Sequence, residues 1–318
     1  MQLYAIGIKM VSSSKIYNSL NIKKKHKNSI ILIGNFDGIH LGHQKLFSLA
    51  KDYKKKYSIN IGVLTFEPMP KMFFNKELKN FRLSNLSQKI NFLKNLKVDF
   101  IIVNKFNKKF SKTKSITFIK EIIGKKLKPK FIFVSNNFKF GNKREGNVKQ
   151  LIKYQNICNY TVVKPKPLFV NKKIVSSTLI RKLLQKGNLK KANNYLDKKW
   201  SIIGKVQKGK QLGKKIGFPT ANIDIKDYIL ACPGVYSVKV KLPNNKNIRG
   251  IANLGYRPTF NGKKILLEVH LFNFSGNLYN KVLTVNFLSF IRKEKKFKNV
   301  DHLKKQIKTD LLKAKKIR

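Results

Sequence analysis

The sequence predicts a two-part fold: an α/β domain with a parallel sheet, followed by a compact β-barrel that ends in one helix. Three observations lead to this prediction. The 318 residues exceed what one core usually holds, so two domains of roughly 150 residues are expected. Short apolar runs alternate with helix-like stretches in the first half. Strand-like runs punctuated by Gly, Pro and Asn fill the second half.

Four buried strands are expected in the first half, because four apolar runs are short, continuous and rich in β-branched or aromatic residues. They are residues 29–33, 60–66, 99–103 and 130–134. Three stretches between them carry apolar residues at helical spacing: residues 42–57, 87–96 and 114–126. Alternating strands and helices imply a parallel sheet covered on both faces, which is a Rossmann-like nucleotide-binding architecture.

The second half is predicted to form mainly strands, at residues 201–206, 234–241, 248–253, 265–274 and 282–289. The helical period returns at about 300–315, where one face carries Leu303, Ile307, Leu311 and Leu312. Closely spaced strands before one terminal helix favour a β-barrel. The predicted domains are residues 1–186 and 187–318.

The charge is dominated by lysine. Lys plus Arg number 70 against 14 Asp plus Glu, a net charge of +56, and seven of the cations are Arg. Dense positive charge is typical of phosphate-backbone binders. Recognition of bases and phosphates favours the guanidinium fork, however, so a solvated lysine-rich surface is the preferred interpretation. Hydrophobic residues at 42 % exclude a disordered basic tail.

The expected location is the cytoplasm. Cys158 and Cys232 lie far apart without CxxC spacing, which gives neither a disulfide framework nor a zinc site. The N-terminus lacks the apolar region of a signal peptide, and no apolar stretch approaches the ~20 residues that a bilayer span needs. No membrane partner is therefore expected.

The first candidate site follows the first strand, where the sequence reads GNFDGIHLGH from Gly34 to His43. Glycines let a backbone approach a phosphate, and the N-terminus of the following helix presents free N–H groups. Two histidines flanking Gly42 can hold a triphosphate and stabilise the charge that develops as pyrophosphate leaves. A loop in which one histidine caps the helix and the other packs is the structural alternative.

A second segment whose residues suit the binding of phosphates is VSSTLIR, from Val175 to Arg181. Consecutive hydroxyls at a helix start cap free N–H groups, and an Arg one turn later can reach the same anion. Taken alone, the segment is more often a helix cap than a binding site. Beside a triphosphate site, the binding interpretation is favoured.

The second candidate site is a glycine run at 204, 209, 213 and 217 that ends in FPTAN, Phe218 to Asn222. Gln211 occupies the position where a P-loop needs Ser or Thr, so a P-loop is rejected. The run is instead predicted to be a flexible loop over phosphates, with Thr220 and Asn222 as hard oxygen ligands for Mg²⁺.

Glu268 lies within the predicted strand 265–274, and period two places it on one face with Leu266, His270 and Phe272. A carboxylate among apolar neighbours is a candidate general base for a hydroxyl group. An ordinary exposed strand glutamate is the alternative.

The order of several motifs resembles that of the bacterial bifunctional riboflavin kinase/FAD synthetase family. The first module carries GNFDGIHLGHQKL, LTFEPMP, VSNNFKFGNKREGN and VSSTLIRKLLQKGNLKKA. The second carries GKVQKGKQLGKKIGFPTANI, PGVYSV, ANLGYRPTF, LLEVHLFNFSGNLYNKVLTVNF and IRKEKKF. The resemblance implies an HxGH nucleotidyltransferase domain followed by a six-stranded antiparallel riboflavin kinase barrel.

The resemblance implies that the first module transfers AMP from ATP to FMN, which gives FAD and pyrophosphate. Its implied ATP-binding residues are Gly34, Asn35, Phe36, His40, Gly42, His43, Ser176, Thr178 and Arg181, and His40, His43 and Arg181 would be catalytic. Asn137 and Phe138 would face the flavin and the metal.

In the second module the resemblance implies phosphorylation of riboflavin to FMN, with Glu268 as the base and Arg292 at the flavin. The implied ATP and Mg²⁺ site comprises Gly209, Gly213, Gly217, Pro219, Thr220 and Asn222. ATP, riboflavin, FMN and FAD are thus the expected substrates and products. A homo-oligomer is left open.

Met69, Lys139 and Lys214 depart from the family's usual residues, and LDKKW at 196–200 replaces its usual Gly-Arg-Pro-aromatic junction. Two alternatives are kept: a protein with one active module, and a basic nucleic-acid-binding protein without flavin chemistry.

Overall fold

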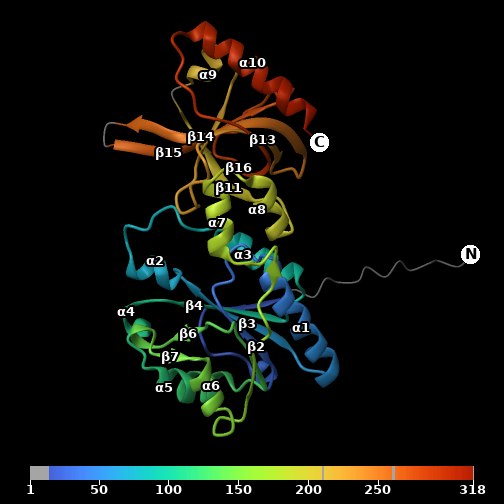
Figure 1. The fold of residues 1–318 in the computed structure, drawn as a ribbon, viewed down its shortest axis with the longest axis vertical. Coiled ribbons are helices and arrows are strands. Elements are labelled where there is room, and N and C mark those ends of the chain that lie inside the picture. The colour runs from blue at the N-terminus through green and yellow to red at the C-terminus, as the bar shows by residue number, and fades with distance from the viewer. Residues whose placement is uncertain (1–13, 210, 260–261, 318) are drawn as a thin grey trace, which may run out of the picture. The chain divides into compact units, whose positions relative to one another are not determined.

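The computed structural model describes residues 14–209, 211–259 and 262–317 (Figure 1). Lys210 of the glycine run and Phe260 of the ANLGYRPTF motif lie outside these residues. Contacts divide the chain into two compact units. The first comprises residues 1–36, 43–74 and 89–167, and the second comprises residues 37–42, 75–88 and 168–318.

The first unit contains a six-stranded parallel sheet in the order β1-β4-β3-β2-β5-β8. Its strands are β1 Lys15–Tyr17, β2 Ile30–Ile33, β3 Ile61–Glu67, β4 Phe100–Lys105, β5 Phe131–Phe133 and β8 Thr161–Val163. The four predicted central strands are confirmed. The two edge strands were not predicted, because Lys15–Tyr17 and Thr161–Val163 are only partly buried and each begins with a polar residue, unlike the fully buried run of β5.

Helices cover both faces of this sheet, as predicted. Their bounds are α1 Leu41–Tyr57, α2 Pro70–Phe74, α3 Leu86–Asn95, α4 Lys108–Ser111, α5 Ser115–Thr117 and α6 Val148–Lys153. Tyr53 of α1 packs edge-on against Phe131 and Phe133 of β5. The stretch Phe118–Leu127 is a π-helix, and its apolar side chains pack with the opposite set of strand residues, such as Ile132.

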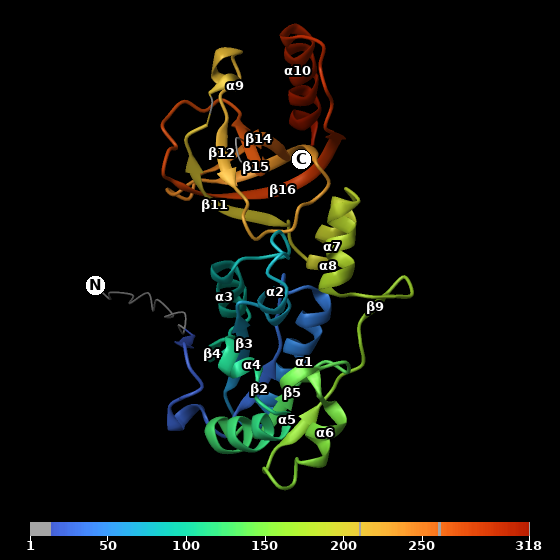
Figure 2. The same cartoon turned by 90° about the vertical axis from the view of Figure 1, so that its left-hand side faces the viewer.

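The second unit contains a closed barrel in the order β11-β12-β15-β14-β13-β16, antiparallel throughout (Figure 2). The strands are β11 Ser201–Gln207, β12 Ala221–Asp224, β13 Gly234–Lys241, β14 Asn247–Thr259, β15 Gly262–Leu271 and β16 Val282–Lys293. Strand β12 was not among the runs predicted from periodicity. Its inward residues fill the barrel core together with Trp200 and Phe287.

The remaining elements of the second unit are helical, apart from a small hairpin. They are α7 Ser177–Gln185, α8 Leu189–Leu196, α9 Leu212–Lys215 and α10 Val300–Lys316, and the hairpin is β9 Phe169–Val170 with β10 Lys173–Ile174. The first unit has a similar hairpin, β6 Lys139–Phe140 with β7 Gly146–Asn147.

Helix α10 lies along the outside of the barrel, where Ile307, Leu311 and Ala314 pack against Val235 and Ile251. The prediction that Leu312 shares this face is wrong, because Leu312 is 62 % exposed. Ala314 takes that place since it lies three residues after Leu311, on the same helical face.

Candidate functional site

The carboxyl end of β2 is the first place where predicted site residues gather. Strand β2 lies between β3 and β5. After β2 the chain adds β3 and β4 on one side of it, and then adds β5 on the other side, so the order of the strands reverses at β2. Ligands of open α/β sheets bind at such a switch point, outside the carboxyl ends of the strands. Gly34, Asn35 and Phe36 follow β2, and Asn137 and Phe138 follow β5.

The segment after β2 is held against the neighbouring strand. Gly34 N–H donates to the carbonyl of Leu64 at 3.1 Å, and Thr65 Oγ1 donates to the carbonyl of Asn35 at 3.3 Å. The buried ammonium of Lys89 donates to Thr65 Oγ1 at 3.3 Å. A chain of three polar groups therefore fixes the backbone where phosphates are predicted to bind.

Phe36 and His43, both in the first unit, are in contact. Phe36 is 2 % exposed, and its ring packs edge-on against the His43 imidazole with centroids 5.2 Å apart. Phe36 also contacts Phe47 of α1. This packing fixes the plane of the His43 ring at the start of α1.

Asn137 and Phe138 have local partners. Asn137 Oδ1 accepts a hydrogen bond from Ser135 at 3.0 Å, and Phe138 stacks on Phe140. The exposed Asn137 amide and the half-buried Phe138 ring follow β5 at the switch-point edge.

Residues 37–42 belong to the second unit, and Asp37 is their main anchor. The residue is 2 % exposed, and its carboxylate accepts hydrogen bonds from Leu83 N–H and Ser84 N–H. Arg181 Nη2 lies 2.5 Å from Asp37 Oδ2, and Ser177 Oγ donates to the Asp37 carbonyl. The sequence analysis did not predict a role for Asp37, although the residue lies within the GNFDGIHLGH segment.

His40 is held as a neutral imidazole. It is 5 % exposed, and burial lowers its pKa to about 3, with Lys198 and Arg181 acting in the same direction. Gly42 is needed beside it, because a Cβ there would lie 2.9 Å from the Val175 carbonyl oxygen and 3.1 Å from His40 Nδ1.

The VSSTLIR segment begins α7, as predicted. Ser176 is the N-cap, and its hydroxyl accepts from Leu179 N–H at 3.2 Å, while Thr178 is exposed. Arg181 stacks on the Phe81 ring and donates from Nε to the Phe81 carbonyl, in addition to its pairing with Asp37. Burial lowers the pKa of Arg181, which the carboxylate of Asp37 opposes.

The second gathering of predicted residues is on the barrel. Asn222 on β12 lies directly opposite Glu268 on β15, and Glu268 lies opposite Asn253 on β14. Directly opposed residues project from the same face. Ala221, Ile223, Leu267 and Val269 fill the core, so Asn222, Glu268 and Asn253 project outward. Asn253 was missed, because finding it requires the strand register.

The glycine run packs on Asn222 and Thr220. A Cβ on Gly209 would lie 2.3 Å from the Asn222 amide nitrogen, and one on Gly213 would lie 3.3 Å from Thr220 Oγ1. Gly217 has a φ of +90°, which only glycine adopts readily. The Pro219 carbonyl hydrogen-bonds His270 Nδ1 at 2.9 Å, which ties the end of the run to the strand of Glu268.

Arg292 is engaged by α10. Its guanidinium lies 2.7 Å from the buried carboxylate of Asp310, which also accepts from Gln306. The partner Asp310 was not predicted, since nothing local in the sequence links it to Arg292.

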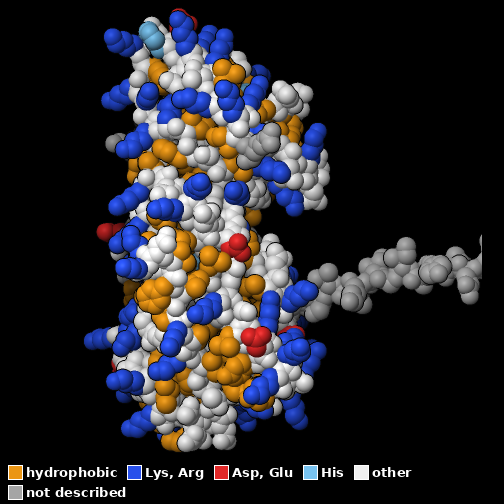
Figure 3. All heavy atoms as spheres, turned by 45° about the vertical axis from the view of Figure 1, so that its right-hand side comes forward, with side chains coloured by type: hydrophobic (Ala, Val, Ile, Leu, Met, Phe, Trp, Pro, Cys, Tyr) orange, Lys and Arg blue, Asp and Glu red, His pale blue; other side chains and the backbone are white. Residues whose placement is uncertain are grey.

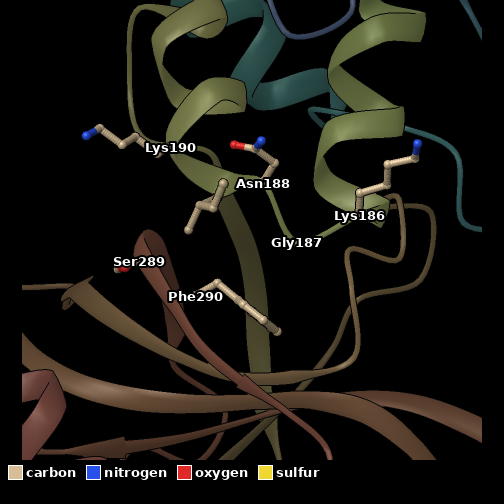
Figure 4. A pocket seen from close by; sticks show the side chains of 7 residues that line it. Lys186, Gly187, Asn188, Lys190, Ser289 and Phe290 are labelled. Atoms are coloured by element: carbon tan, nitrogen blue, oxygen red, sulfur yellow. The ribbon is translucent and has the colours of Figure 1, made fainter.

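A surface pocket of ≈ 410 Å³ lies beside the α7–α8 connection and holds none of the predicted site residues (Figure 4). Lys186, Gly187, Asn188, Leu189, Lys190, Ser289 and Phe290 line it. Lysine and arginine side chains are spread over the face drawn in Figure 3, without a single gathering. Among the described residues, no helix is long and apolar enough to cross a membrane, and no three His, Cys, Asp or Glu form a metal-binding group.

Comparison with known proteins covers both parts of the chain. A family model described as FAD synthetase matches residues 22–179, and one described as riboflavin kinase matches residues 196–318. A bifunctional riboflavin kinase/FMN adenylyltransferase from Buchnera aphidicola of Schizaphis graminum is 42 % identical over 92 % of this chain and 94 % of its own length. The enzyme of the same description from Haemophilus influenzae is 39 % identical over 93 % and 96 %.

A solved structure from Streptococcus pneumoniae, described as a macrolide-efflux protein, matches with a TM-score of 0.81 and 28 % identity. The match covers 94 % of this chain and 97 % of that one.

Proposed function

The chain belongs to the family of bifunctional riboflavin kinase/FMN adenylyltransferases, and on that premise we propose which residues carry each reaction. The barrel phosphorylates riboflavin with ATP to give FMN. The α/β part, with the segment from Gly34 to His43 and the start of α7, transfers AMP from ATP to FMN. The proposed functional boundary is near residue 187.

The observation that carries the kinase assignment is the row of Asn222, Glu268 and Asn253 on neighbouring strands, with the glycine run packed on Asn222 at one end of the row. In this proposal the Glu268 carboxylate accepts the proton of the ribityl 5′-hydroxyl as its oxygen attacks the γ-phosphorus. The bond between that phosphorus and the leaving ADP oxygen breaks. The glycine run covers the phosphates, and positioning and charge neutralisation supply most of the rate.

The adenylyl-transfer assignment is supported by the switch point of the sheet. Gly34–Phe36 follow β2 at this point, and Asn137–Phe138 follow β5. An oxygen of the FMN phosphate attacks the α-phosphorus of ATP directly, and pyrophosphate leaves. His40 and His43 contact the phosphates and stabilise the developing charge. No residue forms a covalent intermediate.

Mg²⁺ fits the kinase residues. It prefers hard oxygen ligands, and few of them come from the protein, because substrate phosphates and water supply the rest. The Thr220 hydroxyl and the Asn222 amide oxygen are such ligands, and both lie under the glycine run. The ion would neutralise phosphate charge there, while Thr220 and Asn222 orient it.

Separate assays of the two reactions test the proposal. Purified protein receives riboflavin, ATP and Mg²⁺ in one assay, and FMN, ATP and Mg²⁺ in the other, and the flavins are separated by chromatography. Glu268→Gln should lower FMN formation by about 10²–10⁴-fold while FAD formation from supplied FMN persists. His43→Ala should do the reverse.

A wild-type protein that forms FMN but no FAD would restrict the proposal to one active module. A protein that forms neither flavin product would overturn it.

A further inference from the structure

Lys198 reaches from the end of α8 to the backbone of the GNFDGIHLGH segment. Its Nζ donates to the carbonyl of Ile39 at 2.8 Å and to the carbonyl of Leu196 at 3.1 Å. All three residues belong to the second unit. A single ammonium therefore joins the end of a helix to the residue that precedes His40.

The backbone held in this way is strained. Ile39 has a φ of +41°, where a β-branched residue is an outlier, and it follows Gly38, whose φ of +80° glycine adopts readily. Such conformations persist only where the surroundings hold them, and they gather at functional sites. Ile39 is held on both sides, because its side chain is 2 % exposed and its carbonyl accepts from Lys198.

The charges around this contact come from three elements. Lys198 and Arg181 both lower the pKa of buried His40, and Arg181 is itself paired with Asp37. Burial lowers the pKa of Lys198 to about 8, which Asp197 at the end of α8 partly opposes. Near neutral pH the ammonium is thus charged, and it loses its proton at moderately alkaline pH.

We propose that Lys198 is a positioning residue for adenylyl transfer, which holds the Ile39 carbonyl so that His40 meets the ATP phosphates in one orientation. This inference rests on the proposed function, in which His40 contacts those phosphates. Because the charged ammonium makes the stronger hydrogen bond, adenylyl transfer should weaken as Lys198 loses its proton.

The test compares Lys198→Met, Lys198→Arg and the control Lys199→Met, which alters the exposed neighbouring lysine. FAD formation from supplied FMN is measured from about pH 6 to about pH 10, with kcat and KM for ATP determined separately. FMN formation from riboflavin in the same samples reports on the fold.

Lys198→Met should lower kcat/KM for adenylyl transfer about ten- to hundredfold, as expected for loss of a charged donor. The wild type should lose activity above pH about 8, and Lys198→Arg should retain it there, because a guanidinium stays charged. Lys199→Met should match the wild type in both assays.

Adenylyl transfer by Lys198→Met within about twofold of wild type would overturn the proposal. A loss of adenylyl transfer at alkaline pH that persists unchanged in Lys198→Arg would also overturn the proposal. If Lys198→Met fails to fold, the pH profile of Lys198→Arg decides the question. Absence of FAD formation in the wild type would instead refute the proposed function.

Discussion

Asp37→Asn should destabilise the second unit, because Asp37 is the buried acceptor that joins three separate stretches of chain. Its carboxylate receives Leu83 N–H at 3.1 and 3.0 Å and Ser84 N–H at 3.1 Å. It also receives Arg181 Nη2 at 2.5 Å, and the two side chains are only 3 % and 11 % exposed. Asparagine keeps the shape but leaves the guanidinium without its counter-charge.

The expected loss follows from the burial of the pair. Removing one partner of a buried ion pair costs about 3–5 kcal/mol, because the other charge stays desolvated. Asn keeps one acceptor oxygen, so the lower end of that range applies. For a unit of this size, about 1 kcal/mol lowers Tm by about 2–4 °C, which gives a fall of about 6–12 °C.

Differential scanning calorimetry at neutral pH measures this fall, with Asp52→Asn on the exposed surface of α1 as the control. Arg181→Met and the double variant complete a double-mutant cycle. If the pair interacts as described, the double variant loses less than the two single losses added together. A shift below about 2 °C for Asp37→Asn, or strictly additive losses, would refute the reasoning.

Three further outcomes are expected. Gly213→Ala should raise the KM for ATP in steady-state assays of the kinase reaction, and not in those of adenylyl transfer, because its Cβ would lie 2.5 Å from the Phe218 carbonyl oxygen. An unchanged KM in the kinase reaction would contradict this prediction. Trp200→Phe should lower the free energy of unfolding, measured in urea, by about 1–3 kcal/mol, because it removes the hydrogen bond from Trp200 Nε1 to the Leu83 carbonyl. An unchanged midpoint of urea unfolding would count against this prediction. Since the His40 pKa falls to about 3 on folding, the unfolded chain binds more protons from about pH 6.5 down to about pH 3, and stability falls over that window. His40→Gln should flatten that part of the stability profile measured by thermal unfolding.

The central elements of the first unit were predictable because each has a strong local pattern. Ile30–Ile33 is a continuous apolar strand, Phe100–Lys105 begins with four apolar residues, and α1 carries its apolar residues at helical spacing. The edge strand β1 carries no such signal, because Lys15–Tyr17 begins with an exposed lysine and has no continuous apolar run, and it forms a strand through its pairing with β4.

The partners of the site residues were not predictable, because they depend on contacts between distant parts of the chain. Asp37 meets Arg181 across 144 positions, and Lys198 meets Ile39 across 159. The glycine run and Glu268 could be recognised from residue types, whereas Asn253 became visible only through the pairing of β14 with β15.

The arginines of this lysine-rich chain show where a planar fork is used. Arg82 faces Asp227, Arg181 faces Asp37 and Arg292 faces Asp310. Arg249 donates to backbone carbonyls at the end of α10, among them that of Ala314 at 2.6 Å. Lysine supplies one compact charge, whereas Arg181 and Arg292 each use two or more donor nitrogens in fixed directions. The predicted ligand roles of Arg181 and Arg292 therefore require these side chains to serve a bound phosphate or flavin while they still hold their carboxylates.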